Sequence, residues 1–193
     1  MSLVWGFDSG VEALEGLSLA VGVAVCRAAE RCGVKGLQLK WPNDLLWQQQ
    51  KVGGILLEVI GDPAGFCQVV IGVGLNVDMP EQSAGEIDQQ WTDINSIAGG
   101  KVGRSLLAGC LLDELLVLLT DYEEVGFPHY RDEWLRRDAF AGLPVKLIMV
   151  SREVEGVAKG VTDSGALCLE LDGASGKELK EFSGGEISLR AVR

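Results

Sequence analysis

Apolar residues return at helical spacing in three parts of this 193-residue chain. Between Leu14 and Cys32 an apolar side chain recurs every three or four positions, and Gly33 follows where a helix would end. The same spacing is clearest from Arg104 to Tyr122 and recurs over Phe127–Arg137. The pattern therefore predicts three helices, and we expect a shorter helical piece within Trp91–Ala98.

A different pattern, alternation or short apolar runs between turn residues, predicts strands in the first half of the chain. Gln48–Lys51 separates two such runs and is typical of a hairpin, whereas Gly61–Gly65 supplies Gly, Asp and Pro before the next run. Together these runs indicate an antiparallel sheet of at least three strands. The expected strands cover residues 36–40, 45–47, 52–60 and 67–77.

The composition changes after Gly142. Short strands then alternate with Gly-bearing turns, at the regular spacing of a small β-barrel. These strands are expected at residues 145–150, 154–161, 166–171 and 187–189. We therefore predict an α+β protein of two domains. Residues 1–141 would form a mixed or antiparallel central sheet with packed helices, and residues 142–193 a small β-barrel.

The charge and the cysteines argue against several kinds of function. A net charge of −11 repels phosphate backbones, so we expect no direct nucleic-acid binding, although a nucleotide ligand needs only a local positive pocket. No apolar run reaches the roughly 20 residues that span a bilayer, and the N-terminus lacks the pattern of a signal peptide. The five cysteines have neither disulfide nor zinc-site spacing. We expect buried free thiols in a cytoplasmic protein, with no metal site and no membrane association.

The glycines of Gly72–Val77 begin like a dinucleotide-binding fingerprint. The third glycine is replaced by valine and no helix follows, so this reading fails on context. Two interpretations stay open. Either the strand lacks side chains at the glycines because another part of the protein packs closely against it, or a ligand lies over that strand.

The block Lys40–Asp44 gathers a cation, an aromatic ring, an amide and a carboxylate in five residues. Its proline predicts a turn, which is the simpler interpretation. The functional one is that Trp41 offers a stacking surface and that the hairpin returns Lys51 toward Asp44, which would orient the ammonium group. A positioned lysine beside Gly53–Gly54 suits a phosphate or carboxylate oxygen.

These blocks, taken in order, resemble the catalytic region of biotin–protein ligases. Lys-Trp-Pro-Asn-Asp, then Lys51 with Gly-Gly-Ile-Leu-Leu-Glu, then Gly-Val-Gly-Leu-Asn follow one another between Lys40 and Val77, close to the family form. Pro144–Ile148 and Gly184–Arg190 resemble the end of the bacterial members, which also act as biotin-operon repressors. The resemblance implies a class II synthetase-like catalytic domain followed by an SH3-like barrel.

The resemblance also implies a reaction in two steps. Biotin and ATP, the latter accompanied by Mg²⁺ rather than by a metal held in a protein cage, give biotinyl-5′-AMP and pyrophosphate. The biotinyl group then passes to one lysine of the biotin carboxyl carrier protein of acetyl-CoA carboxylase. The bacterial members form dimers through their central sheets when the adenylate forms, so a homodimer is expected.

Roles for particular residues follow from the resemblance alone. Lys51 matches the lysine that contacts the biotin carboxylate and the α-phosphate, and Asp44 matches the motif aspartate beside it, so these two are the expected catalytic pair. The other matches fall into two groups. The biotin pocket would be lined by Gly53, Gly54, Ile55, Leu56, Gly72 and Gly74, and the adenylate would be held by Lys40, Asn43, Asn76 and Trp91.

One departure from the family puts the activity of this chain in question. Upstream of this region the family carries a Ser/Thr-rich biotin-contacting turn, a Gly-Arg-rich adenylate loop and, in repressors, a winged helix-turn-helix. This sequence contains none of them, so we interpret it as an N-terminally truncated member. The missing adenylate loop favours inactivity of this chain by itself, whereas the intact Asp44 and Lys51 favour an enzyme. Two hypotheses follow: a biotin–[carrier protein] ligase, or a non-catalytic module that binds biotin or serves as an association surface. A third, a lipoate ligase relative, fits the Lys40–Asp44 block poorly.

Overall fold

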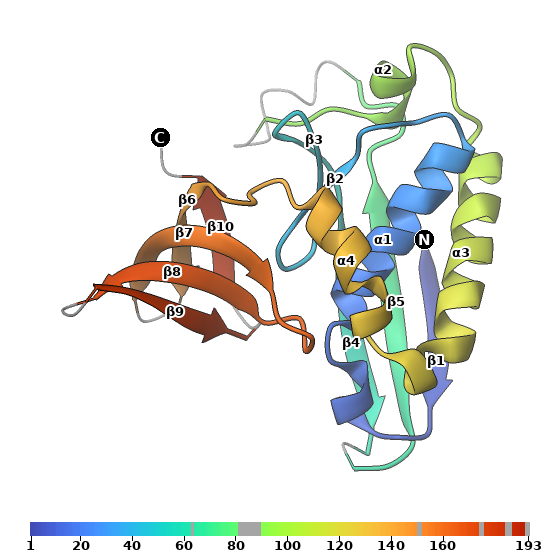
Figure 1. The fold of residues 1–193 in the computed structure, drawn as a ribbon. Helices are drawn as coiled ribbons and strands as arrows, with labels where there is room; N and C mark the ends of the chain where they lie inside the picture. Colours follow the sequence, from blue (N-terminus) through green and yellow to red (C-terminus); the bar gives the residue numbers. More distant parts are fainter. Residues whose placement is uncertain (63, 81–89, 150–151, 174–175, 184–186, 192–193) are drawn as a thin grey trace.

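Two five-stranded antiparallel sheets organise the chain (Figure 1). The computed structural model describes residues 1–193 apart from 63, 81–89, 150–151, 174–175, 184–186 and 192–193. Position 150 of a predicted strand and the Gly184–Glu186 part of the C-terminal block lie outside the described residues. None of the helices described is both long and apolar enough to cross a membrane.

The N-terminal sheet has the strand order β1-β5-β4-β3-β2. The long hairpin of β4 and β5 forms its centre, with Leu56 opposite Gly72 and Gly54 opposite Gly74. Alternate side chains of these strands enter the core, as expected for a sheet with one covered face. The strands are β1 (Ser2–Phe7), β2 (Gln38–Lys40), β3 (Asp44–Trp47), β4 (Gln50–Gly61) and β5 (Cys67–Leu75).

Helix α1 (Leu17–Arg31) lies against that sheet and is buried along most of its length, because its side chains are small and apolar. Helices α3 (Arg104–Val125) and α4 (Pro128–Arg137) pack against α1. The first predicted helix is in fact interrupted at Gly16, where a left-handed residue separates the 3-10 turn η1 (Val11–Leu14) from α1. A short helix, α2 (Ile94–Ala98), begins at the side-chain cap of Asp93.

No helix among the described residues covers the opposite face of the N-terminal sheet, which we call the outer face. It presents Val4, Leu56 and Ile60, each more than half exposed. Phe66 is also more than half exposed and lies over Gly6, whose added Cβ would come within 3.0 Å of the Phe66 ring. The outer face therefore combines apolar side chains with the glycines of β4 and β5.

The C-terminal sheet has the strand order β10-β6-β7-β8-β9 and curves strongly (Figure 1). Its strands β6, β7, β8 and β10 match the sequence prediction, whereas β9 was missed because its alternating Lys and Glu residues carry no apolar pattern. That composition suits an edge strand. The strands are β6 (Pro144–Met149), β7 (Glu153–Val161), β8 (Leu167–Gly173), β9 (Gly176–Phe182) and β10 (Ile187–Ala191). The predicted α+β class is confirmed.

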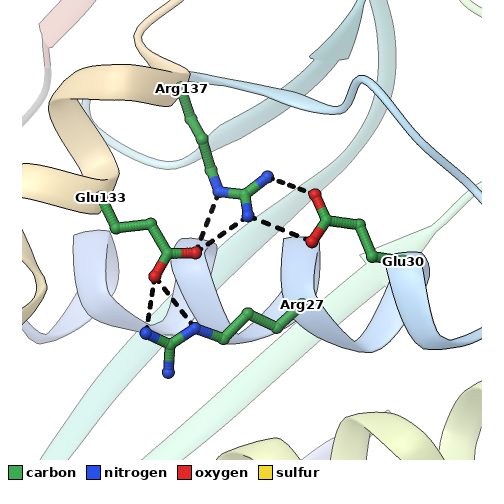
Figure 2. Close-up of polar contacts among 4 residues, drawn as sticks. All are labelled: Arg27, Glu30, Glu133 and Arg137. Carbon is green, nitrogen blue, oxygen red and sulfur yellow. Dashed lines mark hydrogen bonds and ion pairs between the residues drawn. The ribbon is translucent and has the colours of Figure 1, made fainter.

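A network of four charges joins α1 to α4 (Figure 2). The Glu133 carboxylate accepts hydrogen bonds from Arg27, at 2.6 Å from Nη2, and from Arg137, at 2.9 Å from Nη2. Arg137 also donates to Glu30 at 2.7 Å. Burial opposes ionisation of Glu133, but the two guanidinium groups outweigh it and lower its pKa.

Replacing Glu133 with glutamine should therefore lower the free energy of unfolding by about 2 kcal/mol at neutral pH, because two arginines lose their shared counter-charge. The ordinary glutamate pKa is 4.5 and the folded value lies below it. The stabilisation is thus complete above pH 5 or so and disappears as the pH falls through the folded pKa. Urea unfolding at several pH values measures this difference. Glu124→Gln, at an exposed site on α3, is the control, and an equal effect of both variants would contradict the prediction.

Candidate functional site

The Lys40–Asp44 block forms the tight turn between β2 and β3, with Lys40 and Asp44 paired across it. The Trp41–Pro42 peptide bond is cis. The Pro42 carbonyl accepts a hydrogen bond from the Ser18 hydroxyl of α1 at 3.3 Å, and the Asn43 amide donates to the Ile55 carbonyl at 2.9 Å. The turn is thus fixed to α1 on one side and to β4 on the other.

Asp44 stands between two lysines. Its Oδ2 lies 2.7 Å from Lys40 Nζ and its Oδ1 lies 2.6 Å from Lys51 Nζ. A bulge between Leu45 and Leu46 shifts the β3–β4 register, so that Lys51 pairs with Leu46 while Asp44 pairs with Gly54. Bulges re-aim side chains in this way, and here Lys51 reaches the face on which Asp44 lies.

Lys40, Lys51 and Asp44 together carry one net positive charge, in a protein whose net charge is −11. Burial raises the pKa of Asp44, but hydrogen bonds from both lysines outweigh it, and the net pKa lies below the ordinary value. Burial also lowers the pKa of Lys40, despite Asp44, and the charge of Arg190 on β10 acts in the same direction. Lys51 is the more exposed of the two lysines, with 31% of its side chain accessible. Its ammonium group is therefore the one available to an anionic ligand.

Beside these charges the outer face carries a hollow of about 440 Å³. Gly54, Gly72 and Gly74 form its floor. A Cβ added to any of them would meet protein atoms only at ordinary contact distances, 3.4 Å or more. No close neighbour therefore demands glycine at these three positions, and the space above them is open. This favours the interpretation that a ligand lies over these strands.

Most of the predicted site residues line this hollow. The described lining also includes Met1, Ser2 and Val73, which the sequence motifs did not indicate. The predicted residues that line it are Asn43, Asp44, Lys51, Gly54, Ile55, Leu56, Gly72 and Gly74.

Four predicted residues lie outside the lining. Gly53 points away from it, and a Cβ there would overlap the Gly74 carbonyl oxygen, so this glycine is explained by strand packing. Lys40 is 8% exposed and lies behind Asp44. The Asn76 amide donates to the Thr92 carbonyl at 3.2 Å. The backbone of Trp91 pairs with that of Lys51 as an isolated β-bridge. Asn76 and Trp91 therefore hold the segment that supports the Lys51 backbone.

The expected stacking role of Trp41 is wrong. Its side chain is 2% exposed, and its indole Nε1 donates to the carbonyl of Gly165 in the C-terminal sheet at 3.0 Å. The cysteines agree better with expectation: all five are free, and only Cys32 is more than marginally exposed. Within the described ranges no three His, Cys, Asp or Glu side chains gather as metal ligands would.

Comparison with known proteins gives two matching family models. Residues 1–76 match the biotin/lipoate A/B protein ligase family, and residues 141–190 match the biotin protein ligase C-terminal domain. The chain is 37% identical over 192 residues to the bifunctional ligase/repressor BirA of Escherichia coli, covering all of this chain and 58% of that protein. It is 34% identical over 164 residues to the biotin–[acetyl-CoA-carboxylase] ligase of Paracoccus denitrificans, covering 83% of this chain and 64% of that protein.

Solved structures agree with these matches. The biotin protein ligase of Aquifex aeolicus in complex with biotin and ATP superposes with a TM-score of 0.78 at 26% identity, over 99% of this chain and 79% of that one. The apo structure of the same ligase gives a TM-score of 0.79. This chain thus spans a little under two thirds of the curated relatives and nearly four fifths of the ligase solved with biotin and ATP.

Proposed function

Because the chain belongs to the biotin protein ligase family, we propose that it forms biotinyl-5′-AMP from biotin and ATP and passes biotin to a lysine of a biotin carboxyl carrier protein. The observation that carries this proposal is the Lys51 ammonium, held by Asp44 at the edge of an open glycine floor. Residues 1–141 would act as the catalytic domain and residues 142–193 as the C-terminal domain.

In the first step a carboxylate oxygen of biotin attacks the α-phosphorus of ATP, and pyrophosphate leaves. The attack brings the negatively charged carboxylate up to the negatively charged α-phosphate oxygens. Lys51 would stabilise both, since a cation fixed in advance at a partly buried site costs no reorganisation during the reaction. Asp44 would keep the ammonium in place, and Lys40 would hold the second oxygen of Asp44 so that the carboxylate does not rotate. Mg²⁺ would enter with the phosphates of ATP.

The glycine floor would serve the apolar part of biotin. With no side chain at Gly54, Gly72 or Gly74, the fused rings of biotin can approach the backbone of β4 and β5 closely. Leu56, 61% exposed beside that floor, would cover one side of the ligand. In the second step the carrier lysine attacks the carbonyl of the mixed anhydride and AMP leaves. Such a carrier and the free thiols of this chain both fit a reducing cytoplasm.

The test is ATP-dependent transfer of biotin from the purified 193-residue chain to a carrier domain, with biotin binding measured on the same sample by calorimetry. Transfer above background supports the proposal. Binding without transfer would assign the chain to the alternative, a biotin-binding or association module. Displacement of biotin by lipoate at equal concentration would instead favour a lipoate ligase relative.

We further propose that two copies associate through the outer face. Its exposed Val4, Ile60 and Phe66 lie on the same face as Leu56, which lines the hollow, so a ligand in the hollow would add to the apolar surface of that face. Sedimentation velocity with biotin and ATP should show a dimer that Ile60→Lys weakens at least tenfold. Val117→Lys, at an equally exposed site on α3, is the control. Monomer alone at high concentration with ligand present would contradict this.

A further inference from the structure

Trp41 belongs to the Lys40–Asp44 block, but the proposed reaction gives it no role. It is almost completely buried, and its indole N–H reaches across to the C-terminal sheet, where Gly165 accepts it at 3.0 Å. Gly165 lies in the turn between β7 and β8. A block that carries the ligand-facing Asp44 is therefore attached directly to the second sheet.

The accepting turn is closed by hydrogen bonds among its own residues. The Thr162 N–H donates to the Ala166 carbonyl at 2.9 Å, and the Ala166 N–H donates to the Thr162 hydroxyl oxygen at 3.0 Å. The Gly165 N–H donates to the Thr162 carbonyl at 3.0 Å. Gly165 itself has φ +82°, a conformation that side chains disfavour. The direction of its carbonyl is thus fixed by the turn.

The turn also fits closely against the helices. A Cβ added to Gly165 would lie 2.9 Å from the Cα of Gly16, the residue that immediately precedes α1. At the start of the same turn, the Val161 carbonyl accepts a hydrogen bond from Arg131 Nε of α4 at 2.8 Å. The C-terminal sheet therefore meets α1, α4 and Trp41 at one junction, between the two sheets in Figure 1.

We propose that Trp41 is a positioning residue through which the C-terminal sheet sets the placement of Asp44 and, through Asp44, of the Lys51 ammonium. Only Pro42 and Asn43 separate Trp41 from Asp44 in this tight turn. A rotation of the turn would move Asp44 Oδ1, which lies 2.6 Å from Lys51 Nζ. The expected effect on kcat rests on the proposed function. The dependence of the Asp44 and Lys51 positions on Trp41 does not.

Trp41→Phe keeps an aromatic ring but removes the N–H donor together with part of the buried indole. We expect kcat for biotinyl-5′-AMP formation to fall about tenfold, while KM for biotin and for ATP changes less than about threefold, because a misplaced Lys51 affects the transition state most. Gly165→Ala, which disturbs the same hydrogen bond from the other side, should lower kcat similarly. Trp5→Phe, a partly buried tryptophan of β1, is the matched control for the substitution.

The double variant decides between positioning and general stability. If both changes act through one hydrogen bond, Trp41→Phe combined with Gly165→Ala should lose little more than either alone. If the kcat of the double variant fell by the product of the two single losses, the proposal would be overturned. It would also be overturned if the variants lowered thermal stability but left kcat unchanged.

A measurement without turnover keeps the inference separate from the proposed function. In ¹H–¹⁵N spectra of the unliganded chain, Trp41→Phe should shift the amide signals of Asp44 and Lys51, whereas Trp5→Phe should leave them in place. If the chain proves inactive, the proposed function fails and this result still decides the coupling. Unshifted Asp44 and Lys51 signals would overturn it.

Discussion

Replacing Lys51 with alanine should lower the rate of biotinyl-5′-AMP formation by on the order of 10²–10³-fold, the loss typical when one pre-positioned electrostatic group is removed. The physical reason is its placement. Lys51 is the partly exposed cation at the hollow, and its Nζ is held 2.6 Å from Asp44. Biotin-dependent exchange of pyrophosphate into ATP measures this step without a carrier protein.

Lys35→Ala, at an exposed lysine after α1, controls for the loss of one positive charge from the whole protein. It should change the exchange rate less than twofold or so, because exposed charges far from a site are screened by salt. If Lys51→Ala retained the rate of the unaltered chain, or if Lys35→Ala lost as much, Lys51 would not be the group that stabilises the adenylation transition state.

Replacing Gly74 with valine should weaken biotin binding at least about 100-fold, a loss of about 2.8 kcal/mol of binding free energy, and leave the fold intact. A Cβ at Gly74 would meet no protein atom closer than 3.9 Å, so the strand accepts it, and valine suits a strand. The new methyl groups would stand where the ligand is proposed to lie. Calorimetry gives the affinity, and thermal unfolding shows whether the fold is intact.

Substitutions at two other glycines serve as controls for this experiment. Gly109→Ala, at an exposed position within α3 with nothing within 4 Å, should leave biotin binding unchanged and raise the free energy of unfolding by about 0.5–1 kcal/mol, because alanine favours a helix over glycine. Gly53→Ala should instead destabilise the fold, because its Cβ would overlap the Gly74 carbonyl. Unchanged biotin affinity in a folded Gly74→Val protein would show that the ligand does not use this floor.

Much of the fold followed from local pattern. The helices near α1, α3 and α4 and the strands β3 to β5 were predictable because their apolar spacing matches the period of each element. Three features were not, and the first is strand β1, which the apolar pattern did not indicate. Strand β9 consists largely of charged residues, and its pairing with β8 comes from tertiary structure. The break at Gly16 depends on its left-handed conformation, within an apolar run that otherwise continues into α1.

The site was predictable as a set of residues, but not as a geometry. The hairpin length indicated that Lys51 returns toward Asp44, whereas the bulge at Leu45 and Leu46 that aims Lys51 has no signal of its own in the sequence. The sequence does not distinguish Gly53 from Gly54. In the structure, Gly53 allows close packing against β5, whereas Gly54 borders the hollow. Sequence also gave no reason to turn Trp41 away from a ligand, because its partner, Gly165, is 124 residues distant.

The central claim is that Lys51, Asp44 and the glycine floor form a biotinyl-5′-AMP site. A crystal structure of this chain soaked with that compound tests it most directly. We expect the ring system of biotin over Gly54, Gly72 and Gly74, and Lys51 Nζ within hydrogen-bonding distance of an oxygen at the carboxyl–phosphate junction. Density for the compound elsewhere on the protein, or a vacant hollow at saturating concentration, would contradict the claim.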